Sequence, residues 1–230
     1  MTYGKLYGVG VGPGDPKQMT YLAVETIRKC PVLAIPAGGG DYSVSYRIAS
    51  GMVEDLDDKE HLDIPTPMTK DRDVLDASYR EAAERIADQL AMGRDVAYLT
   101  LGDPTIYATY IYIHRLIKDM GYEAVIVNGI PSFCAVAAKL GDSLCDRSEQ
   151  LHIIPSSYDI EDALALPGTK VLMKAGSNLQ NVKGFLMQSG DSCEAVANCG
   201  LEGEEVYRSA DSLPEKGSYF TVVVVKENRS

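Results

Sequence analysis

The sequence predicts an α/β protein with two lobes, residues 1–128 and residues 129–230. Strand-like and helix-like segments alternate through the first half, which is typical of parallel α/β sheets. Several short apolar runs are followed by glycine turns, an arrangement that places small-molecule sites at the ends of strands. Beyond residues 125–135 the strands come close enough in sequence to pair antiparallel, which indicates a second lobe of different construction.

In the first lobe, the expected strands and helices follow each other in turn. The strands are expected at 5–10, 32–35, 62–64, 95–101 and 124–127, with Pro36 ending the second. The helices are expected at 20–29, 44–51, 71–92 and 107–120. The clearest helix has Ala82, Ile86 and Leu90 at four-residue spacing, and Gly93 follows it as a stop signal.

The second lobe is expected to mix helices with strands that pair in both directions. Its helices are expected at 132–140, 159–166 and 178–189. Its strands are expected at 151–154, 170–173, 194–197, 205–208 and 219–226. The last of these is rich in β-branched residues, which predicts a strand in the centre of a sheet.

Charge and hydropathy exclude several classes of partner. The chain carries 22 basic and 33 acidic side chains, a net charge of −11, whereas nucleic-acid binding favours a clustered basic face. No apolar run approaches the roughly 18 residues that a membrane span requires. The residues after Met1 enter a strand without a basic region and an apolar signal core. We therefore expect a cytoplasmic protein with no nucleic-acid or membrane partner.

The cysteines and histidines predict no metal site. None of the cysteines belongs to a C-x-x-C pair, and the few histidines show no zinc-binding spacing. Reduced cysteines in a cytosolic core are the favoured interpretation. The residues concerned are Cys30, Cys134, Cys145, Cys193, Cys199, His61, His114 and His152.

Four glycine-marked segments in a fixed order are the strongest functional signal, and the first three each follow an apolar run. They are Gly8–Pro16, Leu101–Tyr107, Asn128–Phe133 and Leu172–Gly176. The first is close to a dinucleotide-binding fingerprint, but the second strand ends at Pro36 where that fingerprint requires an acidic residue. No Gly-Lys-Ser/Thr follows, which excludes a Walker phosphate loop.

The second segment has the features of a ligand-facing turn. Gly102 permits close approach to the backbone, and Pro104 fixes the turn. Asp103 can accept hydrogen bonds or lie near a cation; alternatively it caps the helix that follows.

Together these segments resemble those of the tetrapyrrole methylases, which use S-adenosylmethionine in the corrin and sirohaem pathways. The resemblance covers nearly the whole chain. Tyr98–Tyr107 and Ile130–Ala138 are most similar to the C20-methyltransferases, which act on precorrin-2 or cobalt-factor II in cobalamin (vitamin B12) biosynthesis. It implies a homodimer of two-lobed α/β subunits, with the cofactor in the cleft between the lobes.

The resemblance also implies roles for particular residues. Pro13 would flank the cleft, the Leu101–Ile106 turn would surround the methionine end of the cofactor, and Ser132 and Phe133 would contact its ribose and adenine side. Residues of the fourth segment, with Gly200 nearby, would cover the adenine. The implied cofactor-binding set is Pro13, Leu101, Gly102, Asp103, Ile106, Ser132, Phe133, Met173, Lys174, Ala175 and Gly200.

A tetrapyrrole polycarboxylate would require local positive charge in this acidic chain. Candidates to bind it are Lys17, Arg47, Lys70 and Arg72, with Tyr107 against the macrocycle. No catalytic base can be assigned, and the motifs fit a substrate with or without cobalt. Two alternatives remain open: a relative that acts on another ring position or another kind of target, and a non-enzymatic ligand-binding module.

Overall fold

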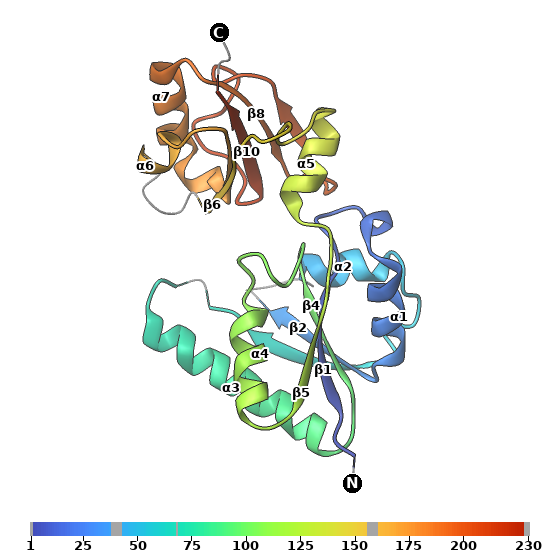
Figure 1. Ribbon diagram of the computed structural model, residues 1–230. Helices are drawn as coiled ribbons and strands as arrows, with labels where there is room; N and C mark the ends of the chain where they lie inside the picture. Colours follow the sequence, from blue (N-terminus) through green and yellow to red (C-terminus); the bar gives the residue numbers. More distant parts are fainter. Residues whose placement is uncertain (1, 38–42, 68, 156–160, 228–230) are drawn as a thin grey trace. The chain divides into compact units, whose positions relative to one another are not determined.

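The computed structural model describes residues 2–37, 43–67, 69–155 and 161–227 (Figure 1). The chain divides into two compact units, residues 1–131 and residues 132–230. The first unit includes Gly129, whose amide is hydrogen-bonded to Asp103 of that unit.

The first unit contains a five-stranded parallel sheet. Its strands are β1 (Lys5–Gly10), β2 (Val32–Ala37), β3 (Glu60–Pro65), β4 (Val96–Thr100) and β5 (Glu123–Val127), in the order β3-β2-β4-β1-β5. Every neighbouring pair is parallel, so all five carboxyl ends lie at one edge of the sheet. The alternation of strands and helices in the sequence correctly predicted this sheet.

Helices cover both faces of this sheet. They are α1 (Tyr21–Lys29), α2 (Val44–Ser50), α3 (Arg72–Ala91) and α4 (Tyr110–Asp119), with a short 3₁₀ turn, η1 (Pro16–Gln18). Helices α3 and α4 lie side by side against the face that carries Leu6, Ala34 and Tyr98 (Figure 1). Leu33 and Leu99 are next to Ala34 and Tyr98 in β2 and β4, so their side chains point to the other face of the sheet. They are fully buried as well, because α1 and α2 cover that face.

This arrangement creates a topological switch point between β1 and β4. The two strands are neighbours, but the chain leaves β1 toward α1 and leaves β4 toward α4, on opposite faces of the sheet. In open α/β sheets the loops at such a point are the usual place for a ligand.

The second unit has a mixed sheet. Its strands are β6 (Leu151–Pro155), β7 (Thr169–Met173), β8 (Ser192–Ala197), β9 (Glu205–Tyr207) and β10 (Thr221–Lys226), in the order β6-β7-β10-β8-β9. Strand β10 is central and antiparallel to both neighbours, which confirms the predicted central strand and the antiparallel pairing. Helix α7 (Leu179–Ser189) packs on the face that carries Leu172 and Val223, and α5 (Ser132–Leu140) contacts β8 and β10.

Several predicted boundaries differ from the observed ones. Helix α4 begins at Tyr110 instead of Tyr107, because Tyr107 has a positive φ of 47° that a right-handed helix does not allow. Strand β2 continues through Pro36, since beyond Ala34 it pairs only with β3. The short helix α6 covers Glu161–Leu164, and the predicted start at 159 lies outside the described residues.

Candidate functional site

The first two glycine segments meet at the carboxyl edge of the parallel sheet. The Gly102 amide donates to the Gly12 carbonyl at 2.8 Å, and the Gly12 amide donates to the Gly102 carbonyl at 3.2 Å. The Val11 amide also donates to the Thr100 carbonyl at 2.9 Å. These backbone bonds extend the pairing of β1 and β4 into the loops, so the two turns at the switch point form one connected surface.

The third glycine segment packs against the first two without room for side chains. A Cβ atom on Gly129 would lie 2.1 Å from the Gly102 carbonyl oxygen and 2.9 Å from the backbone of Gly10. A Cβ atom on Gly10 would lie 2.6 Å from that same oxygen. Glycine is therefore required here by backbone packing, and the sequence signal reflects the close approach of three loops.

The Asp103 carboxylate joins two of these loops. It is 6% exposed. One oxygen accepts from the amide and hydroxyl of Thr105, and the other accepts from the Asn128 side chain at 3.1 Å and the Gly129 amide at 3.0 Å. Burial acts to raise the pKa of Asp103, but these hydrogen bonds outweigh it and hold the pKa below its ordinary value.

Asp103 does not cap the following helix, as one interpretation of the sequence suggested. Its side chain accepts from the backbone amides of Thr105 and Gly129, whereas α4 begins at Tyr110, and its N-cap residue Thr109 makes no side-chain capping hydrogen bond. The partners that sequence reasoning missed are Thr105 and Asn128. A Thr two residues after an Asp is a recognisable turn signal, but the Asn128 contact spans 25 residues and has no local signature.

The charge of these loops selects the kind of ligand they can hold. Residues 8–15, 101–107 and 128–131 include two carboxylates, Asp15 and Asp103, and no Lys or Arg. Around them are the buried Pro13 and the half-buried apolar side chains of Leu101 and Ile106. Such a set favours a cationic group beside apolar surface and disfavours a phosphate.

The tyrosines at the start of α4 differ in their surroundings. Tyr110 is fully buried, and its hydroxyl donates to the Val125 carbonyl at 2.9 Å, so it is a core residue. Tyr112 is half-exposed and stacks on Tyr79 with 5.0 Å between ring centroids. Tyr107 is 49% exposed, and of the three it is the one that lies in the loop after β4.

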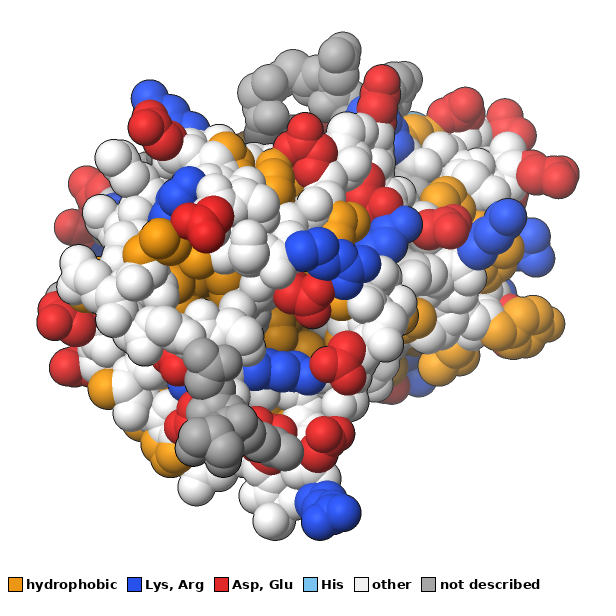
Figure 2. Space-filling model, turned by 90° about the horizontal axis from the view of Figure 1, so that it is seen from above, with side chains coloured by type: hydrophobic (Ala, Val, Ile, Leu, Met, Phe, Trp, Pro, Cys, Tyr) orange, Lys and Arg blue, Asp and Glu red, His pale blue; other side chains and the backbone are white. Residues whose placement is uncertain are grey.

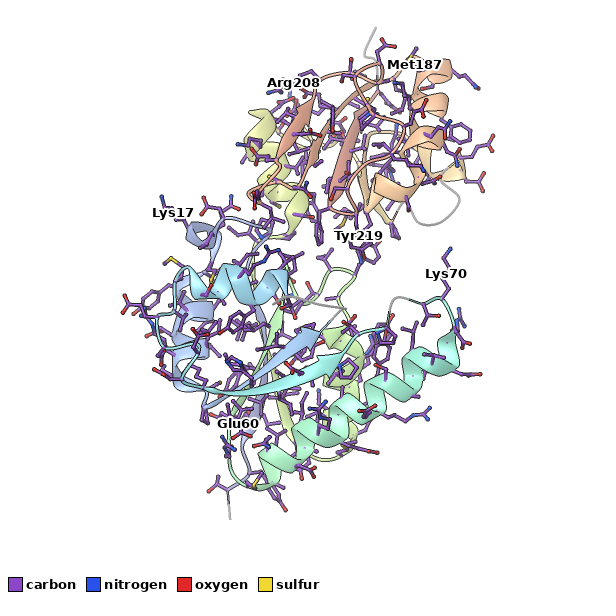
Figure 3. All side chains as sticks on the ribbon, turned by 180° about the vertical axis from the view of Figure 1, so that it is seen from behind. Lys17, Glu60, Lys70, Met187, Arg208 and Tyr219 are labelled. Carbon is purple, nitrogen blue, oxygen red and sulfur yellow. The ribbon has the colours of Figure 1, made fainter. Side chains whose placement is uncertain are left out.

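The second unit gathers its own loops at one edge of its sheet. Met173 ends β7, and Lys174 follows in the left-handed conformation with φ of 58°. The Lys174 ammonium lies 5.6 Å from the ring centroid of Tyr219, which projects from this edge in Figure 3. Ala175 and Gly176 are buried, and a Cβ atom on Gly176 would lie 2.0 Å from the Ser218 carbonyl oxygen.

Gly200 belongs to this same edge through a chain of contacts. Ser218 donates to the Asn198 side chain at 2.6 Å, and Asn198 precedes Gly200 in the loop after β8. The Gly200 amide donates to Glu204, which pairs with Lys139. The structure therefore brings Met173, Lys174 and Ala175 near the Gly200 loop.

The remaining two predicted cofactor residues, Ser132 and Phe133, begin helix α5. Phe133 is buried and Ser132 is half-buried.

The four candidate basic residues fall into two separate pairs. Lys17 on η1 and Arg47 on α2 come from adjacent elements, whereas Lys70 and Arg72 lie at the start of α3. Figure 3 shows Lys17 and Lys70 on opposite sides of the first unit. All four are exposed. On the face shown in Figure 2, acidic and basic side chains are interspersed.

Fold and loops together define a class: an α/β protein in which glycine turns at strand ends form a ligand site. The family model for tetrapyrrole (corrin/porphyrin) methylases matches residues 5–212. The chain belongs to that family. Within the part of the chain that the structure describes, no helix combines the length and apolar character needed to span a bilayer.

Two curated proteins illustrate the relationship. The chain is 37% identical over 171 residues to a probable cobalt-precorrin-2 C(20)-methyltransferase of Methanocaldococcus jannaschii, covering 74% of this chain and 72% of that protein. It is 28% identical over 235 residues to a precorrin-2 C(20)-methyltransferase of Sinorhizobium, covering 96% and 95%.

Solved structures share the fold. The uroporphyrin-III C-methyl transferase of Thermus thermophilus, complexed with S-adenyl homocysteine, matches with a TM-score of 0.73 at 16% identity. The match covers 97% of each chain. The α/β fold is thus that of the tetrapyrrole methyltransferases.

Proposed function

We propose that this protein is an S-adenosylmethionine-dependent methyltransferase that methylates C20 of cobalt-factor II or precorrin-2 in cobalamin biosynthesis. The observation that carries this proposal is the family match across residues 5–212, together with relatives of that named activity. The glycine loops of the first unit support the proposal independently. They contain carboxylates and no Lys or Arg, which favours a cation such as a sulfonium over a phosphate.

In this proposal the first unit positions the cofactor. When bound, the cofactor supplies an electrophilic methyl group on a positively charged sulfur. Leu101, Gly102 and Ile106 would border its methionine end, and the Asp103 charge would favour the sulfonium through space. Pro13 would lie alongside. The ribose and adenine of the cofactor are proposed to contact Ser132, Phe133, Met173, Lys174, Ala175 and Gly200.

Alignment is the main task left to the protein. Methyl transfer from a sulfonium is an in-line displacement at carbon, and correct orientation alone can lower such a barrier by roughly 7–11 kcal/mol. Backbone-built loops suit that task, because hydrogen bonds between main-chain groups hold them in place. Lys17, Arg47, Lys70, Arg72 and Tyr107 are proposed to contact the tetrapyrrole, and the active form is proposed to be a cytoplasmic homodimer.

A labelling experiment tests the reaction. The protein is incubated with S-adenosylmethionine carrying a ¹³C methyl group and either cobalt-factor II or precorrin-2, and the product is examined by NMR. Label at C20 is expected. Label at another carbon would show a related methylase, and binding without transfer to either substrate would favour the ligand-binding module.

The same experiment decides the role of cobalt. The name of the Methanocaldococcus jannaschii relative gives a cobalt-containing substrate, and that of the Sinorhizobium relative gives a substrate without cobalt. We favour the cobalt form. A higher kcat/KM for cobalt-factor II than for precorrin-2 is expected, and the reverse ratio would reject that preference.

A further inference from the structure

Asn128 connects three segments at the carboxyl edge of the first unit. Its side-chain amide donates to Asp103 at 3.1 Å in the loop after β4. Its carbonyl accepts from the Thr20 hydroxyl at 3.3 Å, and that hydroxyl also caps α1 by accepting from the Ala23 amide. The next residue, Gly129, donates its amide to the same Asp103 oxygen.

The Asp103 carboxylate has no acceptor capacity left for a ligand. An ionised carboxylate offers about four lone-pair positions. Thr105 fills two of them, and Asn128 and Gly129 fill the other two. The group is also almost completely buried. Its hydrogen bonds therefore act within the protein.

We propose that Asp103 and Asn128 form an internal clip that sets the spacing of the glycine loops, and that Asn128 is a positioning residue for the bound cofactor. This inference rests on the proposed function. Its physical basis is the tight backbone packing of these loops, because Gly129 lies directly against the Gly102 carbonyl and the Gly10 backbone. Loss of the Asn128 side chain removes one of the two bonds between the loop after β5 and Asp103, leaving the Gly129 amide bond, and the surfaces that would border the cofactor then shift.

The test compares Asn128→Ala and Asn128→Asp with the wild type. Loss of one hydrogen bond to a charged group corresponds to about a tenfold change or more in an equilibrium. We expect Asn128→Ala to weaken binding of S-adenosylhomocysteine, measured by calorimetry, about tenfold. Asn128→Asp is expected to weaken it at least as much, because two carboxylates would then face each other.

A matched control lies at the other end of β4. The Asp95 carboxylate also accepts from a backbone amide, that of Lys5 at 2.8 Å, but at the opposite edge of the sheet. Asp95→Asn is expected to leave cofactor affinity unchanged. The exchanged pair, Asp103→Asn with Asn128→Asp, restores one donor and one acceptor and is expected to recover part of the affinity lost in Asn128→Asp.

An NMR titration of Asp103 separates this inference from the proposed function. In Asn128→Ala the pKa of Asp103 is expected to rise, and the Gly129 amide is expected to exchange faster. If a folded Asn128→Ala variant keeps the wild-type pKa of Asp103, the wild-type exchange rate of the Gly129 amide and the wild-type affinity for S-adenosylhomocysteine, the clip is rejected. If the wild type binds neither S-adenosylmethionine nor S-adenosylhomocysteine, the proposed function fails. In that case an unchanged Asp103 pKa and an unchanged Gly129 exchange rate in the variant would still reject the clip.

Discussion

The two units place glycine loops at a sheet edge but hold them by different means. In the first unit, backbone bonds between Gly12 and Gly102 and one buried carboxylate, Asp103, connect the loops. In the second unit, a side-chain bond between Ser218 and Asn198 and the cation–π contact of Lys174 with Tyr219 contribute to the edge. The second edge also has main-chain bonds, from Gly217 to Gly176 and from Asn198 to Phe220, so the units differ in the side-chain groups that supplement the backbone contacts.

Backbone conformation follows the same division. Of the non-glycine residues with positive φ among the described part of the chain, Tyr107 belongs to the first unit, and Arg147, Lys174 and Asn198 belong to the second. A non-glycine residue in this conformation costs about 1 kcal/mol or more. Both units use glycine where backbones meet, at Gly129 in the first and at Gly176 in the second. The second unit also has Lys174 and Asn198 in the positive-φ conformation, and their side chains contact Tyr219 and Ser218.

The largest effect is expected from adding one methyl group at a crowded glycine. Gly129→Ala in the first unit and Gly176→Ala in the second would each place a Cβ atom about 2 Å from a carbonyl oxygen. Backbone would have to move, and each change should lower the free energy of unfolding by about 3 kcal/mol or more.

Two buried thiols report which unit is affected. Burial raises the pKa of Cys30 in the first unit to about 12 and that of Cys193 in the second to about 11. Gly129→Ala is expected to speed alkylation of Cys30 and spare Cys193, and Gly176→Ala the reverse, as measured by mass spectrometry. Equal acceleration at both thiols in both variants would show that the units open together.

A smaller effect is expected when the Asp103 charge is removed. Asp103→Asn leaves donors from Asn128 and Gly129 facing an amide nitrogen, which should cost about 2 kcal/mol at neutral pH. Because the folded pKa is lowered from 3.8, this stabilisation is present above that value and is lost as pH falls through the folded pKa. Urea unfolding of the wild type and of Asp103→Asn from pH 7 to pH 3 should show the difference in their free energies of unfolding becoming smaller. A difference that stays constant over this pH range would contradict the prediction.

A stabilising change is expected in the second unit. Gly184 lies inside α7, and an added Cβ atom would have no neighbour within 4 Å. Gly184→Ala should therefore raise the free energy of unfolding by about 0.5–1 kcal/mol through helix propensity alone. Slower alkylation of Cys193 with unchanged Cys30 would place the gain in the second unit. No gain in thermal unfolding would mean that α7 does not limit that unit's stability.

The smallest effects concern the basic pairs of the first unit. Neutralising Lys17 and Arg47 together, or Lys70 and Arg72 together, should lower kcat/KM for the tetrapyrrole about threefold. Added salt should also lower the wild-type kcat/KM for the tetrapyrrole, because it screens the attraction between the basic side chains and the substrate carboxylates; the Debye length is near 10 Å at 0.1 M salt. Cofactor affinity, measured by calorimetry, should hardly change. If neither pair alters kcat/KM, other groups bind the carboxylates.

Local sequence patterns determined most of the secondary structure. Hydrophobic periodicity places α3 within a residue of its observed ends, and Thr20 caps α1 as its position predicts. The β-branched run at the end of the chain is the central strand of its sheet. These features depend on neighbours in the sequence, which is why the sequence alone reveals them, and the glycine motifs identified the family in the same way.

Only the tertiary structure decided which segments meet. The order of strands, the continuation of β2 through Pro36 and the late start of α4 depend on pairing partners far along the chain. The sequence marked Asp103 as a ligand-facing residue or a helix cap, but its carboxylate joins two loops through Asn128, 25 residues away. A contact between distant residues leaves no periodic trace in the sequence, so its partner becomes visible only when β4 and β5 lie on either side of β1.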